Sequence, residues 1–167
     1  MAKKQLQKTN AARLLDHAGK AYKLVAYPVD ENHLEATHVA ESLGEDISLV
    51  YKTLVLRAGK ELFVCVIPGA EEVDFKKAAK AMGAKKVEMI HVKELLPLTG
   101  YIRGGCSPVG MKQALPTFFH STCLDKEVIY VSAGQRGLQL EMKPQDLIDF
   151  THATVCDLIK TPSSDEK

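Results

Sequence analysis

The sequence predicts a single compact α/β (α+β) domain with a mixed sheet surrounded by helices, on three observations. Its 167 residues are enough for one hydrophobic core and too few for two. Segments with the apolar spacing of helices alternate with short β-rich runs, in an order that is mixed rather than strictly βαβ. No G-x-G-x-x-G follows a strand and no G-x-x-x-x-G-K-[ST] occurs, so neither a Rossmann fold nor a P-loop is indicated.

The first elements are a helix, a strand and a second helix. Thr9 is the expected cap of the first helix, whose apolar residues recur at i, i+3, i+4 and i+7 before Gly19 ends it. Residues 21–28 are expected to form a strand. A short helix over 37–43 should then begin at Thr37.

A hairpin and a core-facing helix follow. Residues 52–57 and 61–67 are β-rich runs joined at Ala58-Gly59, where the glycine suits a tight turn. Asp74 is the expected cap of a helix whose apolar residues, from Phe75 to Met82, have helical spacing.

The C-terminal half is expected to be richer in loop and strand. Residues 86–90 predict a strand, and 98–111 predict a loop with an unusual density of glycine. Later expected elements are strands over 117–120, 128–131 and 138–142 and a helix that begins at Pro144. The domain is expected to span residues 1–160, with a disordered tail over 161–167.

Composition excludes several classes of protein. No run of about 18 apolar residues occurs, and no apolar segment follows the basic N-terminus, so a cytoplasmic location is expected. The four cysteines never form C-x-x-C, and His120 with Cys123 is the only pair of histidine and cysteine residues with the ligand-like spacing H-x-x-C. Two ligands do not make a zinc site, so no metal and no other cofactor is expected.

A net charge of +1 gives the whole chain no strong field for nucleic acid, so RNA binding should be weak or assisted. Lysines do cluster locally, and a solvated helix face explains them at least as well as contact with phosphate does. The clusters are Lys3, Lys4 and Lys8, and Lys76, Lys77, Lys80, Lys85 and Lys86.

Three segments could carry chemistry. In the first, VYKTL, Lys52 shares a strand face with Leu54, so its ammonium either reaches the sheet edge or lies in a pocket that uses its charge. In the second, TGYIRGGCSPVGMK, glycines allow a ligand close to backbone N–H groups that could hold an oxyanion, although an ordinary long turn would look the same. The third, YVSAGQRGL, is a strand end and a turn, or simply a tight hairpin.

In this order and spacing, the three segments resemble the YbaK/EbsC family of aminoacyl-tRNA deacylases. The resemblance runs from about Tyr22 to Asp157 and includes AKAMGAKKVEM between the first two segments. It implies a compact fold with a barrel-like sheet, shared with editing domains of some prolyl-tRNA synthetases. It also implies removal of cysteine from mischarged Cys-tRNA(Pro), with Cys-tRNA(Cys) as a further substrate, and prolyl-tRNA synthetase as the tRNA carrier.

The resemblance also implies the site residues. The catalytic positions correspond to Lys52, Gly104 and Ser132. Substrate-binding positions correspond to Tyr27, Thr53, Gly105, Ser107, Pro108, Gly134 and Arg136. Cys106 could be a nucleophile, but a small packing residue is the better interpretation.

No Ser-His-Asp set is recognisable, which fits a reaction in which the substrate's own thiol attacks its ester and leaves as a thiolactone. The chain departs from the family at Ser132-Ala133-Gly134, where members often have Ser-Gly-Gly, and lacks a pocket phenylalanine between Glu31 and Ala36. The alternatives are hydrolysis of Ala-tRNA(Pro) by a positioned water and a non-catalytic module that binds tRNA or synthetase.

Overall fold

The computed structural model describes residues 7–161, which form five α-helices and two β-sheets. The three-stranded sheet is antiparallel, in the order β1-β7-β6. The five-stranded sheet has the order β4-β2-β3-β5-β8, and β5 is parallel to both of its neighbours. Lys3, Lys4 and all of the predicted tail except Thr161 lie outside the described residues.

The helices and strands have the following bounds: α1 Asn10–His17, β1 Lys23–Ala26, α2 Ala36–Leu43, β2 Tyr51–Ala58, β3 Glu61–Pro68, α3 Phe75–Met82, β4 Glu88–Met89, α4 Val92–Thr99, β5 Thr117–His120, β6 Ile129–Gln135, β7 Leu138–Met142, α5 Pro144–Thr151 and β8 Thr154–Cys156.

The prediction of a barrel-like sheet is wrong, because neither sheet closes on itself. A barrel needs a continuous ladder of hydrogen bonds around its wall. In the described residues, the two sheets are linked by an isolated parallel bridge between Val50 and Tyr130. The mixed α/β domain expected from the sequence is confirmed.

Local signals account for several elements. The Thr9 side chain accepts a hydrogen bond from the N–H of Ala12, and Asp74 accepts from Lys76 and Lys77, as expected for N-caps. The predicted hairpin of β2 and β3 forms, with Ala58 paired to Glu61. Pro144 is the first residue of α5, as predicted.

Other local expectations are wrong. Helix α2 begins one residue earlier than expected, so Thr37 is inside it and Glu35 is an N-cap without a side-chain hydrogen bond. Helix α4 contains Pro97 and was not expected, and β8 was not expected either. The glycine-rich loop therefore begins at Gly100, after α4.

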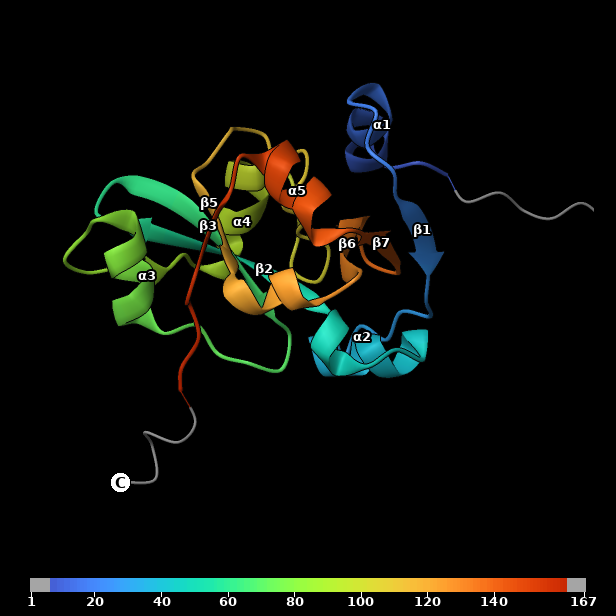
Figure 1. Cartoon of the computed structure of the whole chain (residues 1–167), viewed down its shortest axis with the longest axis horizontal. Helices are drawn as coiled ribbons and strands as arrows, with labels where there is room; N and C mark the ends of the chain where they lie inside the picture. Colours follow the sequence, from blue (N-terminus) through green and yellow to red (C-terminus); the bar gives the residue numbers. More distant parts are fainter. Residues whose placement is uncertain (1–6, 162–167) are drawn as a thin grey trace, which may run out of the picture.

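The five-stranded sheet separates two apolar clusters. Tyr51, Val55 and Val66 face the cluster that contains residues of β6, β7, α1 and α5. Leu56 and Phe63 face the cluster that contains residues of α3. Figure 1 shows the resulting arrangement, with β2 and β3 near the middle, α3 at one end and α1 with β1 at the other.

Candidate functional site

A cavity of about 380 Å³ lies along β2, between α2, α4 and the ends of β6 and β7. This volume is within the range of small-molecule sites. Its lining is formed by Leu34, Glu35, Ala36, Val39, Val50, Tyr51, Lys52, Thr53, Leu54, Val55, Gly69, Met89, Ile90, His91, Val92, Leu95, Arg103, Gly104, Cys106, Ser132 and Gln139.

The cavity exists because one edge of β2 is only partly paired. Strand β4 pairs with Leu56 and Arg57, and the N–H of Ile90 donates to the carbonyl of Val55. In the described part of the chain, residues 51–54 have no strand partner on that edge. An unpaired edge presents backbone N–H and C=O groups, so this part of β2 offers polar main-chain atoms to a ligand.

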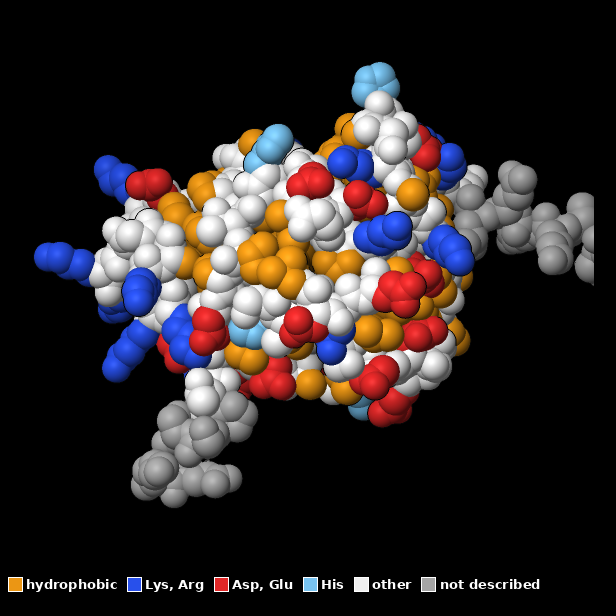
Figure 2. All heavy atoms as spheres, viewed as in Figure 1, with side chains coloured by type: hydrophobic (Ala, Val, Ile, Leu, Met, Phe, Trp, Pro, Cys, Tyr) orange, Lys and Arg blue, Asp and Glu red, His pale blue; other side chains and the backbone are white. Residues whose placement is uncertain are grey.

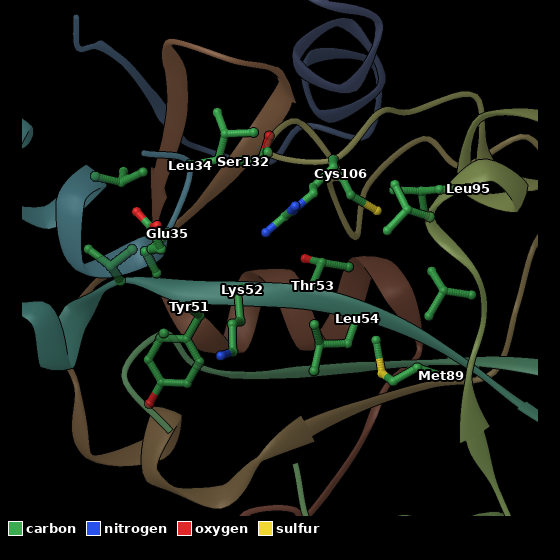
Figure 3. Close-up of a pocket in the computed structure, with 18 of the residues that line it drawn as sticks. Leu34, Glu35, Tyr51, Lys52, Thr53, Leu54, Met89, Leu95, Cys106 and Ser132 are labelled. Carbon is green, nitrogen blue, oxygen red and sulfur yellow. The ribbon is translucent and has the colours of Figure 1, made fainter. Parts of the chain in front are cut away.

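Neighbouring residues of β2 lie on opposite faces of the strand, because side chains alternate. Figure 3 shows Thr53 pointing to the side where Ser132 and Cys106 lie, whereas Lys52 and Leu54 point to the other side. Lys52 and Leu54 therefore lie on the same face of β2 as Leu56, which packs toward α3. The sequence predicts this shared face. The cavity reaches both sides of the strand.

Two polar atoms in the cavity wall are buried without a hydrogen-bond partner. They are Oγ1 of Thr53 and Oε1 of Gln139, the latter on a side chain that is 4% exposed. Burying such an atom unpaired costs about 1–3 kcal/mol. A ligand that donates a hydrogen bond to either atom would remove this cost.

The glycine-rich loop forms a tight turn at the cavity. The N–H of Gly105 donates to the carbonyl of Ile102 at 2.9 Å, with Gly104 in the turn at φ +85°. A Cβ on Gly105 would approach Cα of Gln135 to 3.1 Å and N of Arg136 to 3.2 Å. Only glycine lets this loop lie directly on the β6–β7 turn.

Ser132 lies on β6 directly opposite Gln139 on β7. Its Oγ accepts a hydrogen bond from the N–H of Gly134 at 3.1 Å, where the register of the two strands shifts. A serine hydroxyl has one hydrogen to donate, and this contact leaves it free. Ser132 can therefore donate to a ligand in the cavity.

Helix α4 closes the cavity opposite β6. Glu94 attaches the helix to the sheet, because its carboxylate accepts from Arg57 Nη2 at 2.8 Å and from the N–H of His91 at 2.8 Å. These two contacts, the backbone one first, lower the pKa of Glu94. The pair holds Leu95 against the cavity.

Burial is the main cause of the pKa shifts of Lys52 and Cys106 in the lining. Burial lowers the pKa of Lys52, and the negative charges of Glu72 and Glu71 partly offset this. Burial raises the pKa of the Cys106 thiol to about 12. Near neutral pH Cys106 is thus a thiol rather than a thiolate, which is inconsistent with a nucleophile.

The structure brings four of the expected site residues into the cavity lining: Lys52, Thr53, Gly104 and Ser132. The other six are outside the lining, and several have structural contacts of their own. Ser107 is fully buried and accepts from the N–H of Val109, and Gly134 packs against Tyr101. Arg136 Nε donates to the carbonyl of Arg103 at 2.8 Å. The remaining three are Tyr27, Gly105 and Pro108.

Sequence reasoning missed Gln139, Arg103 and the α4 residues of the lining. A polar residue between Leu138 and Leu140 is the signal that could have singled out Gln139. Arg103 lies in the motif TGYIRGGCSPVGMK, in which the glycines are the more conspicuous signal. Helix α4 carries Pro97, which argues against a helix in sequence.

Two kinds of feature are absent from residues 7–161. No group of three or more His, Cys, Asp or Glu side chains that could hold a metal ion is present there. No helix in this range is long and apolar enough to cross a membrane. Figure 2 shows lysine and arginine side chains projecting around α3, where Lys76, Lys80, Lys85 and Lys86 are exposed.

Comparison with known proteins identifies relatives of this chain. Residues 30–150 match the model of a family described as the aminoacyl-tRNA editing domain. EbsC of Enterococcus faecalis, whose name gives it provisionally as a Cys-tRNA(Pro)/Cys-tRNA(Cys) deacylase, is 46% identical over 160 residues, which are 95% of this chain and 98% of EbsC. A proline–tRNA ligase of Anaeromyxobacter is 31% identical over 110 residues, 64% of this chain and 19% of the ligase.

Two solved structures have the same fold. One, provisionally described as a trans-editing enzyme for prolyl-tRNA synthetase, has a TM-score of 0.81 at 24% identity and covers 93% of this chain and 100% of its own. The other, a hypothetical protein designated APE2540, has a TM-score of 0.81 at 23% identity, with 89% and 97% covered.

Proposed function

The chain belongs to the aminoacyl-tRNA editing domain family, and we propose that it removes cysteine from mischarged Cys-tRNA(Pro). Cys-tRNA(Cys) is proposed as a further substrate, in line with the name of the Enterococcus relative. Such an activity has a clear purpose. A synthetase pocket for proline cannot strongly reject a slightly smaller amino acid, since a methylene is worth only about 1–3 kcal/mol.

The observation that carries the proposal is the pair of unpaired atoms in the cavity wall. Oγ1 of Thr53 and Oε1 of Gln139 can both accept hydrogen bonds. The α-ammonium group of an aminoacyl ester has three N–H donors and no acceptor. An aminoacyl group bound by its ammonium would satisfy both atoms, which the folded protein leaves unsatisfied.

The loop beside these atoms can stabilise the reacting carbonyl. The N–H of Gly105 is engaged by Ile102, whereas the N–H of Gly104 makes no hydrogen bond in the described residues. Gly104 would therefore donate to the carbonyl oxygen as negative charge develops on it. The free hydrogen of the Ser132 hydroxyl would position the ester or its ribose.

The reaction itself needs no nucleophile from the protein. The substrate's thiol sulfur bonds to the ester carbonyl carbon, the bond from that carbon to the ribose oxygen breaks, and the thiol proton ends on the ribose hydroxyl. The products are a thiolactone and free tRNA. The raised pKa of Cys106 supports this route, because the protein's own thiol does not compete.

The cavity walls favour a small side chain. Val55, Ile90 and Leu95 are apolar residues of the lining and belong to the same apolar cluster as Cys106 or pack against it. Such walls accept a thiol and give no partner to a charged or amide side chain. Lys52, on the other side of β2, is proposed to hold the hydroxyls of the terminal adenosine.

Prolyl-tRNA synthetase is proposed as the carrier that presents the tRNA. The net charge of +1 supports an assisted encounter rather than unaided capture of RNA. Similarity to a segment of proline–tRNA ligases supports the same link. Co-purification with the synthetase, with and without tRNA, tests it.

The test of the activity is release of labelled amino acid from Cys-tRNA(Pro), Ala-tRNA(Pro) and Pro-tRNA(Pro) by the purified protein. Selective loss of cysteine is expected. Lys52→Ala is measured in parallel, with Lys60→Ala as control, since Lys60 is an exposed lysine in the turn of the same hairpin.

Three outcomes would contradict parts of the proposal. Stable esters with all three substrates would favour a binding module, and release of alanine alone would favour hydrolysis by a positioned water. If Lys52→Ala left deacylation within about threefold of wild type, the role given to Lys52 would be wrong.

A further inference from the structure

The cavity has an arginine at its rim that the proposed reaction does not yet use. Arg103 lines the cavity next to Gly104, and its side chain is exposed. In the part of the chain that the structure describes, its guanidinium makes no hydrogen bond and no ion pair. An arginine side chain in this state is available to an anionic ligand.

The backbone of Arg103 is fixed although its side chain is free. Arg103 is the second residue of the turn that the N–H of Gly105 closes onto Ile102. Its carbonyl also accepts from Arg136 Nε at 2.8 Å, and Arg136 Nη1 lies 3.8 Å from a carboxylate oxygen of Glu31. One arginine thus holds the loop, while the other is presented at the mouth of the cavity.

The other charged residues near the cavity are less suited than Arg103 to bind an anionic ligand. Lys52 projects from the other side of β2, where the negative charges of Glu72 and Glu71 favour its charged form. Glu35 is the lining carboxylate, and its Oε2 lies 3.9 Å from Nδ1 of His33. On the side of Thr53, Ser132 and Gly104, the cation of the lining is therefore Arg103.

We propose that Arg103 binds the phosphate that precedes the terminal adenosine of the aminoacylated RNA. This inference rests on the proposed function and adds to it the group that holds the RNA end. A guanidinium binds phosphate through two parallel N–H bonds, which fixes orientation as well as distance. With the phosphate held one residue away from Gly104, the ester of the same nucleotide is presented to the N–H of Gly104 and to Ser132.

Binding of small nucleotides tests the phosphate site without the reaction. AMP carries the phosphate in question and adenosine lacks it, so each is titrated into the folded protein by calorimetry. Wild type is expected to bind AMP about tenfold or more tightly than adenosine, the size expected of a charge-assisted hydrogen-bonded pair. Arg103→Gln should abolish this preference and leave adenosine binding unchanged, and Arg103→Lys should keep part of it.

A charge-matched control separates a local contact from a general loss of charge. Arg13→Gln removes one exposed positive charge from α1, which contributes no residue to the lining, and should keep the AMP preference. The inference is overturned if Arg103→Gln keeps the preference, if it weakens AMP and adenosine equally, or if wild type shows no preference for AMP.

Kinetics with Cys-tRNA(Pro) distinguish this inference from the proposed function. If both hold, Arg103→Gln raises KM and leaves kcat nearly unchanged. An Arg103-dependent AMP preference in a protein that cleaves no aminoacyl ester would overturn the proposed function and leave the phosphate site standing. Selective deacylation of Cys-tRNA(Pro) with a KM indifferent to Arg103→Gln would overturn the phosphate site alone.

Discussion

Replacement of Thr53 by valine should raise the stability of the protein and lower its activity. Valine has nearly the shape of threonine but lacks the hydroxyl, and Oγ1 of Thr53 is buried without a partner. Removal of an unpaired buried hydroxyl is worth about 1 kcal/mol or more. For a chain of this size, about 1 kcal/mol corresponds to a rise in Tm of about 2–4 °C.

The same substitution at Thr117 provides the control, because Thr117 Oγ1 donates to the carbonyl of Leu115 at 3.0 Å. Thr117→Val loses that bond and should lower the free energy of unfolding by about 1 kcal/mol. Two identical changes in one chain are thus expected to have opposite signs. Thermal unfolding followed by circular dichroism measures both.

Activity gives the second readout for Thr53. If its hydroxyl binds the aminoacyl group, Thr53→Val should lower kcat/KM for Cys-tRNA(Pro) about tenfold, whereas Thr53→Ser keeps the hydroxyl and should stay within about threefold of wild type. A Thr53→Val variant that is less stable than wild type would refute the reasoning from burial. One that is more stable but fully active would refute the contact with substrate.

Three further predictions concern the loop, the cavity thiol and a buried histidine. Gly105→Ala should lower activity at least about tenfold and destabilise the fold by about 1–3 kcal/mol, because its Cβ would press on the backbone of Gln135 and Arg136. Unchanged unfolding and kinetics would show that the loop shifts to accommodate the Cβ. Cys106→Ala should keep kcat within about threefold, since the thiol is protonated at neutral pH, and a loss of several orders of magnitude would identify a nucleophile. His120 has a pKa lowered by burial, despite Asp157 nearby, and its Nδ1 accepts from the N–H of Leu158 at 3.0 Å. As pH falls, the unfolded chain is protonated at this histidine before the folded chain is. The contribution of His120 to the free energy of unfolding is therefore complete above about pH 6.5 and falls as the pH is lowered from there toward the pKa of the folded state. Chemical denaturation at pH 5.5 and 7.5 should show that fall in wild type, and an equal fall in His120→Gln would assign it elsewhere.

Local chemistry determined much of the fold. Thr9 and Asp74 are the N-caps of α1 and α3, because a short polar side chain can bond the first free N–H groups of a helix, which requires only neighbouring residues. The β2–β3 hairpin forms at Gly59, whose φ of +65° suits a tight turn. Three motifs in register were enough to indicate the family, which the comparisons confirm.

Long-range packing decided the rest. Helix α4 forms in spite of Pro97 because Glu94 is held by Arg57, 37 residues away in the sequence. The two sheets stay open instead of closing into a barrel, since the chain does not continue a ladder between them.

By itself the sequence determined the caps of α1 and α3 and the β2–β3 turn, and it placed Lys52, Thr53, Gly104 and Ser132 among the candidate residues. Only the tertiary structure decided that Thr53 and Gln139 have unpaired buried atoms and that Arg103 is free at the same cavity. The physical reason is that burial and hydrogen bonding at a site depend on which distant segments pack together. Strand β4 covers Leu56 and Arg57 but not residues 51–54, and that difference opens the cavity.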